Sequence, residues 1–590
     1  MNFLPIKRSI PTSIKKAYIK PYGWLCWPIT ILLALLLLFV VVREPIFRYI
    51  LNSKIEQFNR KYHAEIKVKS ISFSGLSTVN LHDFSMKELG KSPLLKASSI
   101  KIGVSFWKIL FKRVSIESVM INDCNISMEK NKTTDNYSFL LKSKGQESES
   151  SSENRTLSRL ADRLATLLFD LIPKKLLLEN IKISFCSGSH TLLMTVPSIN
   201  IADRTFLCHI GVNESGQESN LIAEGILDKS DEEVAVKLYS ESRSGLILPW
   251  LQYRNQATVN MDTAYFKLKH DGNSSDIKQI FTGSVMIKNL SFYQKRIAAD
   301  TVKLSEIGND FTLNIGKDYV EFDSVSTIKI NELTLHPYGY YRPKPSKRII
   351  LSLYKPLFEA SELFNSLPQG LFTNFTGIEV RGKLSYYGFM DVDLALPDSM
   401  VLKSDLWQNN FKIVKPGTTD FAKINNSYTQ HIFEQEKEVK SIELGPSNPN
   451  FISFERIPVS LKNSILMSED GWFFEHGGFS LGAFREACIA DIKAKRFARG
   501  GSTISMQLVK NVFLNRNKNV ARKLEELLIV WILEKQHLVT KERMFEIYVN
   551  IIEWGPGIYG AGEAAKFYFN KNISELTLNE CIYLAAIIPS

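Results

Sequence analysis

Hydrophobic and polar positions alternate along most of the chain between residues 50 and 440. Short segments such as AEIKVKSISFSG and KLLLENIKISF are rich in alternating apolar positions, and Gly, Asn, Asp and Ser separate one segment from the next. A period of two is typical of strands with one buried face, and such turn residues connect neighbouring strands. The pattern therefore predicts a long β-rich region built from antiparallel sheet.

Two segments interrupt this alternation. Residues 143–155, SKGQESESSSENR, are polar and of low complexity, and we expect them to be disordered. Leucines then recur at helical spacing, so residues 156–172 are predicted to form an amphipathic helix that ends before Pro173. A second helix is predicted within residues 346–367.

The pattern changes near residue 457, after which apolar positions recur every three or four residues. This period runs through six segments towards the end of the sequence. Thr540 is predicted to cap one of these helices. Residues 450–590 are therefore predicted to be a mainly α domain.

The N-terminal segment has a third pattern. Residues 23–42 form an uncharged run of 20 residues, enough for a helix to cross the roughly 30 Å hydrocarbon core of a membrane. Residues 1–22 carry five Lys or Arg and no acidic residue, so this basic tail should stay in the cytoplasm while the rest is exported. An uncleaved anchor is favoured over a signal peptide, because no small-residue cleavage site follows.

The chain of 590 residues has a formal net charge of +12. Such a charge can indicate nucleic-acid binding, but an exported chain rarely meets nucleic acid, so none is expected as a partner. The excess is local, because residues 485–523 hold ten Lys or Arg against two acidic residues. An anionic lipid headgroup or a diphosphate is the partner that this cationic stretch favours.

The six cysteines are scattered without a C-x-x-C pair or a histidine at metal spacing. The sequence therefore predicts no zinc or redox site, and no metal-binding residue is assigned. Cys186 and Cys208 have the option of pairing in an oxidising compartment, but separate thiols are the favoured interpretation.

Candidate chemistry begins in the stretch SEDGWFFEHGG. Here the adjacent carboxylates Glu469 and Asp470 are followed by Trp472, Phe473 and Phe474. A carboxylate beside aromatic side chains loses hydration, which favours its protonated form and suits a general base. The alternative is a charged helix end whose aromatic neighbours lie in the core.

A second stretch, RGGSTISMQLVKN, carries groups that suit an anion. A glycine pair permits a tight turn before Ser502 and Thr503, which open a helix whose first N–H groups are free to bind an anion. Lys510 and Asn511 follow two turns later.

A third stretch, RKLEE, places Arg522 and Glu526 four residues apart with Lys523 beside them. On a helix this spacing puts both charges on one face. A structural ion pair is the alternative to a role in binding.

Together these motifs resemble glycosyltransferase family 51, the peptidoglycan glycosyltransferases. The family pattern E-D-x-x-F-x-x-H-x-G is matched at 469–478, G-G-S-T-I-x-x-Q-L-x-K-N at 500–511, and R-K-x-x-E at 522–526. KERMFEIYVN matches a fourth pattern loosely, and EWGPGIYGAGEAAKFYFNK resembles monofunctional members. Met506 stands where many members have a glutamine, and the sequence stops before the Arg-rich block expected next, so the domain is treated as C-terminally incomplete.

The resemblance implies a lysozyme-like fold that polymerises lipid II into glycan strands, with inversion at the MurNAc anomeric carbon and release of undecaprenyl diphosphate. Glu469 would be the catalytic base for the acceptor hydroxyl, and Glu526 the second catalytic carboxylate. A Mg²⁺ ion would accompany the substrate diphosphate. The implied substrate-binding residues are Asp470, Phe473, His476, Ser502, Thr503, Gln507, Lys510, Asn511, Arg522 and Lys523.

The β-rich region has a second, weaker resemblance. The stretch from ISFSGLSTVNLHDF to SIESVMINDCNISM resembles the start of AsmA-like proteins of the diderm envelope. This implies an elongated curved sheet with an apolar inner face that contacts lipid. A plain β spacer is the equal alternative.

The predicted fold class is thus multidomain: a cytoplasmic tail (1–22), a transmembrane helix (23–42), a β-rich AsmA-like periplasmic region (43–440) and a mainly α glycosyltransferase domain (450–590). The predicted location is the inner membrane, crossed once. No transpeptidase motif follows, so a transpeptidase partner is expected. Two other functions stay open, namely a non-enzymatic lipid-binding or lipid-transport protein with a vestigial enzyme domain, and a lytic murein transglycosylase.

Overall fold

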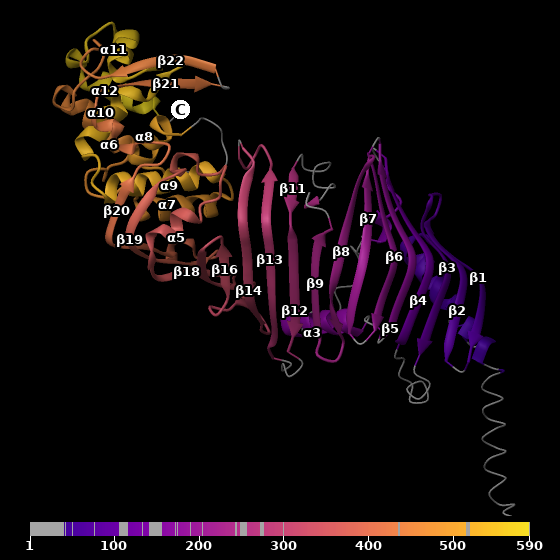
Figure 1. Cartoon of the computed structure of the whole chain (residues 1–590). Helices are drawn as coiled ribbons and strands as arrows, with labels where there is room; N and C mark the ends of the chain where they lie inside the picture. The colour runs from indigo at the N-terminus through magenta and orange to yellow at the C-terminus, as the bar shows by residue number, and fades with distance from the viewer. Residues whose placement is uncertain are drawn as a thin grey trace, which may run out of the picture. The chain divides into compact units, whose positions relative to one another are not determined.

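The computed structural model in Figure 1 assigns the chain to two compact units, Met1–Ser127 with Thr134–Ser143, and Met128–Thr133 with Lys144–Ser590. The structure describes residues 41–588 except 42, 46, 50, 76, 105–115, 132–133, 141–155, 171–172, 174, 189, 203, 242–244, 248–256, 272–276, 299, 435–436, 499 and 515–519. The predicted tail and the predicted disordered loop at 143–155 lie outside the described residues.

The first unit is an antiparallel sheet with a helical segment against it. Its strands pair in sequence order, and a short 3-10 turn, η1 (Ser138–Leu140), follows the last of them. Ile71, Val79 and Leu81 form a small core, against which Phe47 and Leu51 of the preceding helical segment pack. The strands are β1 (Ala64–Ser74), β2 (Thr78–Glu88), β3 (Pro93–Val104) and β4 (Ile116–Lys130).

The predicted fold class needs a correction at its membrane helix. No helix in the described part of the chain combines the length and the apolar character needed to span a bilayer. The predicted span, 23–42, lies outside the described residues apart from Val41. The helix at residues 51–62 carries Lys54, Glu56 and Arg60, and charged side chains are costly in hydrocarbon.

The second unit begins with a large antiparallel sheet, as the alternating pattern predicted. Most strands pair with the next described strand along the sequence, because short turns connect them (Figure 1). The strands are β5 (Lys175–Ser187), β6 (His190–Ala202), β7 (Thr205–Glu214), β8 (Gln217–Asp228), β9 (Glu233–Ser240), β10 (Leu246–Ile247), β11 (Thr258–Met261), β12 (Thr263–His270), β13 (Gln279–Tyr293), β14 (Val302–Ile315), β15 (Val320–Phe322), β16 (Thr327–Ile330), β17 (Leu333–Arg342), β18 (Arg348–Glu359), β19 (Glu379–Asp393) and β20 (Val401–Lys415).

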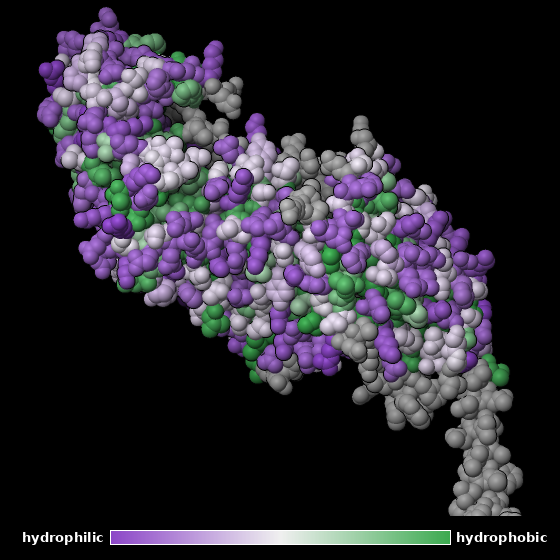
Figure 2. All heavy atoms as spheres, in the orientation of Figure 1, coloured by the Kyte–Doolittle hydropathy of each residue, from purple (hydrophilic) through white to green (hydrophobic). Residues whose placement is uncertain are grey.

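The two faces of this sheet differ in character. The strand register keeps apolar residues opposite one another, as in the pairs Met194↔Val212, Ile210↔Leu221, Ala223↔Leu238 and Ala264↔Ile287. On the other face Lys237 pairs with Glu224 at 2.8 Å and Lys267 with Glu233 at 2.9 Å. In the view of Figure 2, hydrophilic side chains predominate and apolar side chains form smaller groups between them.

Two predicted helices in this region have different outcomes. The first is confirmed, because α3 (Leu157–Asp170) buries Ala161, Ala165 and Phe169 and lies against β13 and β14. The second prediction, within residues 346–367, is wrong for its first half, which forms β18 between β17 and β19. Only α5 (Ala360–Asn365) is helical there.

The C-terminal part of the second unit is helical, as predicted, with two small hairpins. The helix α11 and the hairpin before it were not predicted. The elements are β21 (Tyr428–Glu434), β22 (Lys437–Leu444), α6 (Val459–Glu469), α7 (Leu481–Ala494), α8 (Ile504–Val512), α9 (Val520–Lys535), α10 (Lys541–Ile551), β23 (Glu553–Gly555), β24 (Ile558–Tyr559), α11 (Ala561–Phe569), α12 (Leu578–Ile587) and the 3-10 turns η3 (Thr373–Phe375), η4 (Pro397–Ser399), η5 (Phe421–Asn425), η6 (Phe454–Arg456) and η7 (Ile573–Glu575).

One hydrophobic core joins these helices to the end of the sheet. It contains Phe358 of β18, Leu384 of β19 and Phe411 of β20 together with the inner faces of α6, α8, α9 and α10. The rings of Phe411 and Trp531 have centroids 4.9 Å apart. The last strands of the sheet therefore form part of the support beneath the helical domain.

Candidate active site

The candidate base, Glu469, is the last residue of α6 and is half-buried. The Gln507 side-chain amide on α8 donates to Oε2 of Glu469 at 2.6 Å, and the Tyr548 hydroxyl on α10 donates to the Gln507 amide oxygen at 3.1 Å. Burial, together with the negative charges of Glu469 and Asp470, holds the pKa of Tyr548 well above its ordinary value, so the hydroxyl keeps its proton. Three helices thus fix the orientation of one carboxylate.

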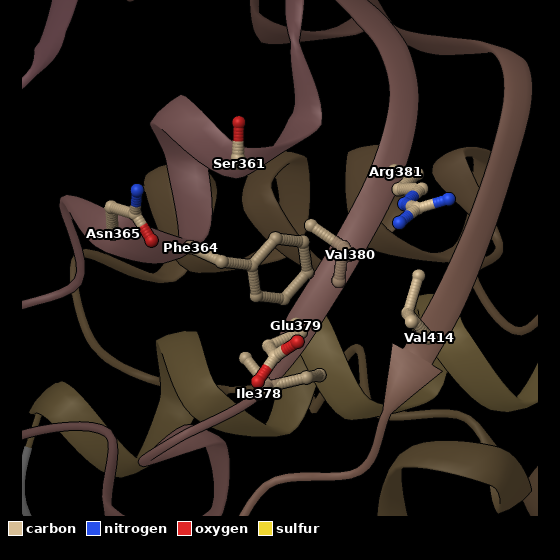
Figure 3. Close-up of a pocket in the computed structure, with 8 residues that line it drawn as sticks. All are labelled: Ser361, Phe364, Asn365, Ile378, Glu379, Val380, Arg381 and Val414. Carbon is tan, nitrogen blue, oxygen red and sulfur yellow. The ribbon is translucent and has the colours of Figure 1, made fainter.

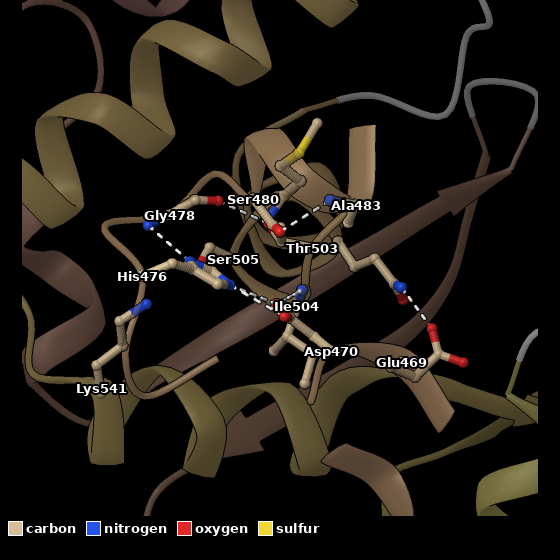
Figure 4. A network of polar contacts seen from close by, with 12 residues as sticks. Glu469, Asp470, His476, Gly478, Ser480, Ala483, Thr503, Ile504, Ser505 and Lys541 are labelled. Atoms are coloured by element: carbon tan, nitrogen blue, oxygen red, sulfur yellow. Dashed lines mark hydrogen bonds and ion pairs between the residues drawn. The ribbon is translucent and has the colours of Figure 1, made fainter. Parts of the chain in front are cut away.

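The neighbouring Asp470 points into the protein. Its two oxygens lie 3.0 and 2.9 Å from Nε2 of His476, and Oδ2 also accepts from the Ile504 N–H at 3.0 Å (Figure 4). The Gly478 N–H donates to Nδ1 of His476 at 3.1 Å, which leaves Nε2 as the nitrogen that donates to Asp470. Asp470 and His476 therefore tie the loop after α6 to the start of α8.

The start of α8 is held by a second contact from the same loop. The hydroxyl of Thr503, the N-cap residue, accepts from the Met506 N–H at 3.2 Å and donates to the Gly478 carbonyl at 2.7 Å. Gly478 has φ +90°, and a Cβ there would lie 2.5 Å from Cγ1 of Val530. The buried Thr503 therefore caps the helix, as its type allows.

The aromatic neighbours of Glu469 separate into core and surface. Phe473 is fully buried, whereas 66% of Trp472 and 38% of Phe474 are exposed. Nζ of Lys541 lies 4.3 Å from the Phe473 ring centre, a cation–π distance. The prediction that Phe473 binds substrate therefore has a competing structural explanation.

Sequence reasoning missed a buried ionic group next to this loop. The Glu534 carboxylate accepts from the Lys541 ammonium at 2.7 Å and from the Ser505 hydroxyl at 2.5 Å. All three side chains come from different helices, so only the tertiary fold brings them together. The available signal was a charged residue within the otherwise apolar run LLIVWILEK.

The predicted cationic residues gather where α8 and α9 begin. Nζ of Lys523 lies 2.6 Å from Oε1 of Glu526 and 3.2 Å from the Ser502 hydroxyl. Glu526 is buried while Lys523 is 47% exposed in its side chain, so the lysine presents its charge to solvent. The carboxylate partner of Lys523 is three residues away, and the predicted Arg522–Glu526 pair is replaced by this contact.

The other predicted residues flank this group on the same helices. Lys510 is exposed near the end of α8, and Asn511 and Arg522 are half-buried. Both the Glu469–Gln507 bond and the Lys523–Ser502 bond involve the first two turns of α8 or the residue just before them. A carboxylate and a cationic group are thereby arranged around one helix start.

A cavity of about 240 Å³ opens beside α5, away from these residues in the sequence. Figure 3 shows the Phe364 ring between Ile378 and Val380, with Arg381 at one side. It is lined by Ser361, Phe364, Asn365, Ile378, Glu379, Val380, Arg381 and Val414, none of which is a predicted site residue.

The five described cysteines are free thiols. Cys208 is buried and Cys186 is exposed, so the favoured interpretation of separate thiols is confirmed. Within the described part of the chain, no three His, Cys, Asp or Glu side chains converge in a way that suits a metal ion.

Known proteins resemble this chain over its C-terminal part. Residues 435–590 match the family model described as Transglycosylase. The chain is 38% identical over 177 residues to a biosynthetic peptidoglycan transglycosylase of Dechloromonas aromatica (strain RCB), which covers 30% of this chain and 72% of the relative. Relatives with the same name match from Methylobacillus flagellatus (41% over 140 residues; 24% and 60%) and Paraburkholderia phytofirmans (42% over 139 residues; 24% and 57%). The chain thus spans between 57% and 72% of these relatives.

Proposed function

The chain belongs to the biosynthetic peptidoglycan transglycosylases, and we propose that its helical domain polymerises lipid II into glycan strands. It is accordingly a peptidoglycan glycosyltransferase of the cell envelope. The observation that carries the proposed reaction is the bond from Gln507 to Glu469, with Tyr548 behind it. It supplies one oriented carboxylate, which the first step requires.

In this reaction Glu469 accepts the proton of the 4-hydroxyl on the acceptor GlcNAc. The oxygen then attacks C1 of the donor MurNAc from the face opposite the phosphate, and the bond from C1 to the phosphate oxygen breaks. Attack from the opposite face inverts C1, and the diphosphate leaves with the bonding electron pair. General-base help of this kind is typically worth about 10²–10⁴-fold in rate.

The departing diphosphate gains negative charge, which needs cationic neighbours. Lys523 is assigned to this role because it is exposed and held between Ser502 and Glu526. Lys510 and Arg522 are assigned with it, and Asn511 is assigned to the donor. Fixed cations of this kind stabilise the transition state without rearranging when the charge develops.

Glu526 acts in this scheme through Lys523, whose ammonium it orients. The buried Asp470, Phe473, His476 and Thr503 are assigned to holding the loop after α6 and the start of α8. They are positioning residues, and Gln507 positions the base.

A Mg²⁺ ion remains a proposal only as a companion of the substrate diphosphate. The described side chains form no cage of three metal-binding groups, and the buried Glu526 already accepts from Lys523. No residue is assigned to the ion, and no step depends on it.

For the β-rich region we propose an AsmA-like role in which the apolar face contacts the hydrocarbon chain of the lipid substrate. Support comes from the register that lines up Ala264, Ile287 and their neighbours, and from Phe266, which is 41% exposed on the same face. A photoreactive residue at Phe266 should crosslink to a polyprenyl diphosphate, whereas one at Lys237 on the polar face should not. Equal crosslinking at both positions contradicts this role.

The proposed enzyme is tested with labelled lipid II in vesicles or detergent. Long glycan chains support polymerisation, whereas anhydro-sugar fragments released from finished glycan identify a lytic enzyme. Lipid II binding without any product identifies a non-enzymatic lipid-binding protein. Cross-linking of the strands is assigned to a transpeptidase partner, so the product should contain no peptide cross-links.

A further inference from the structure

A turn that precedes the family match holds the helix that carries Lys523. Glu525 of α9 is 5% exposed, and its Oε1 accepts from both the backbone N–H of Asn374, at 3.0 Å, and the Asn374 side-chain amide, at 2.9 Å. Asn374 belongs to η3, between α5 and β19, and lies outside residues 435–590. The sheet region therefore contributes both donors to a carboxylate of the enzyme domain.

Asn374 is itself held in place from the sheet side. The Thr419 hydroxyl donates to the Asn374 amide oxygen at 2.6 Å, which turns the NH₂ group towards Glu525. Next to it, Phe375 packs on Phe421 with ring centroids 5.5 Å apart. The donor is thus presented by a fixed turn.

The same turns also contact the end of α8. The Phe421 ring lies 5.5 Å from the ring of Phe513, which ends α8. Phe411 packs on Trp531, further along α9. The sheet region therefore touches both helices whose first turns carry Gln507, Lys523 and Glu526.

The contact at Glu525 has a strict chemical requirement. Burial raises the pKa of this carboxyl, and the bonds from Asn374 oppose that shift. A buried carboxylate that loses its donors must become hydrated or protonated, and either change moves the helix. Lys523 lies two residues before Glu525, so movement of α9 at Glu525 displaces the ammonium that faces the leaving group.

We propose that Asn374 is a positioning residue of the glycosyltransferase: through Glu525 it sets the place of the first turns of α9 and so of Lys523. The inference rests on the proposed function and deepens it, because it makes the end of the β-rich region part of the machinery that stabilises the leaving diphosphate.

The test compares full-length variants that place or remove a charge at equivalent amide groups. Asn374→Asp sets a second carboxylate against Glu525. Asn314→Asp is the matched control, because buried Asn314 of β14 also donates to carboxylates, Glu321 at 3.0 Å and Asp323 at 2.9 Å. The double variant Asn374→Asp with Glu525→Gln exchanges the amide and the carboxylate and restores a donor–acceptor pair.

The readout is lipid II polymerisation, with kcat and KM measured well below the melting temperature of each variant. We expect Asn374→Asp to lower kcat about ten- to a hundred-fold with little change in KM, since small displacements of catalytic groups have effects of this size. The double variant should recover most of the loss, and Asn314→Asp should keep the wild-type kcat. If Asn374→Asp does not fold, Asn374→Ala, which keeps the backbone donor, takes its place.

The proposal is overturned if the Asn374 variant and the Asn314 variant have the same kcat, or if the exchanged pair recovers nothing. These results differ from a failure of the proposed function. In that case the wild-type protein itself makes no polymer, or Lys523→Ala polymerises at the wild-type rate.

Discussion

The Gln507 side-chain amide donates to the Glu469 carboxylate at 2.6 Å. Gln507 was predicted from its motif to bind substrate, but this bond directs its NH₂ group at the proposed base. Because the amide oxygen accepts from Tyr548, the amide has one orientation that satisfies both neighbours. The base is therefore oriented by two side chains that need not contact the sugar at all.

Replacing Glu469 by Gln tests the base directly. The change keeps the shape and removes the ability to accept a proton, so the polymerisation rate should fall by roughly 10²–10⁴-fold. Binding of lipid II should remain close to wild type. Glycan formation and binding are measured with the same labelled substrate, and a near-normal rate of polymerisation would show that Glu469 is not the base.

Replacing Tyr548 by Phe tests the orientation of that base. The ring and its packing remain, while the bond to Gln507 is lost, at a cost of about 1 kcal/mol in unfolding free energy. We expect kcat to fall by about tenfold, because Gln507 then has two orientations of its amide, and the pH profile of kcat to shift. A purely structural Tyr548 would lower the melting temperature and leave that profile in place.

Two lysines with similar carboxylate contacts should respond in opposite ways. Lys523→Ala should lower kcat by about 10²-fold with little loss of stability, because its exposed ammonium is assigned to the leaving group. Lys541→Met should cost about 3–5 kcal/mol in unfolding free energy, because it leaves the buried Glu534 charge without this partner. Activity per folded molecule and denaturant unfolding are measured for both. Loss of stability from the first change and loss of activity alone from the second would reverse the assignment.

The buried Glu525 predicts a pH dependence of stability. Burial raises the pKa of this carboxyl above its ordinary value of 4.5, so the folded state binds its proton more tightly than the unfolded chain. The stability that this proton provides is therefore present below pH 4.5 and is lost as the pH rises through the folded-state pKa. Glu525→Gln removes this loss and should gain stability over wild type as the pH rises. Denaturant unfolding from pH 4 to 8 measures the difference, and parallel curves would contradict the prediction.

The local elements follow from the sequence where one period dominates. The helix α3 and the cap at Thr540 were predicted, because leucine spacing and a capping hydroxyl act within one turn. The segment at β18 was misassigned because its apolar run fits either period, and pairing with β17 and β19 decides the outcome. The helix α11 was missed because it starts at glycines, with Gly560 at φ +83° before it.

The candidate site was predicted as a set of residues and not as a set of contacts. A motif places Asp470, His476 and Thr503 near each other, but it does not say which polar groups face a substrate and which hold the backbone. That distinction depends on partners such as Ile504, 34 residues from Asp470. The contact from Asn374 to Glu525 spans 151 residues and has no local signature at all.

The packed contact between Phe411 and Trp531 also limits how this chain is divided. A chimera that joins the helices to a foreign support at residue 435 would leave the inner side of α9 exposed to water and Phe411 without its partner. Strands β18–β20, with α5 and the turns around Asn374, must therefore travel with the helices in any exchange of parts. The functional cassette of this protein begins within the sheet.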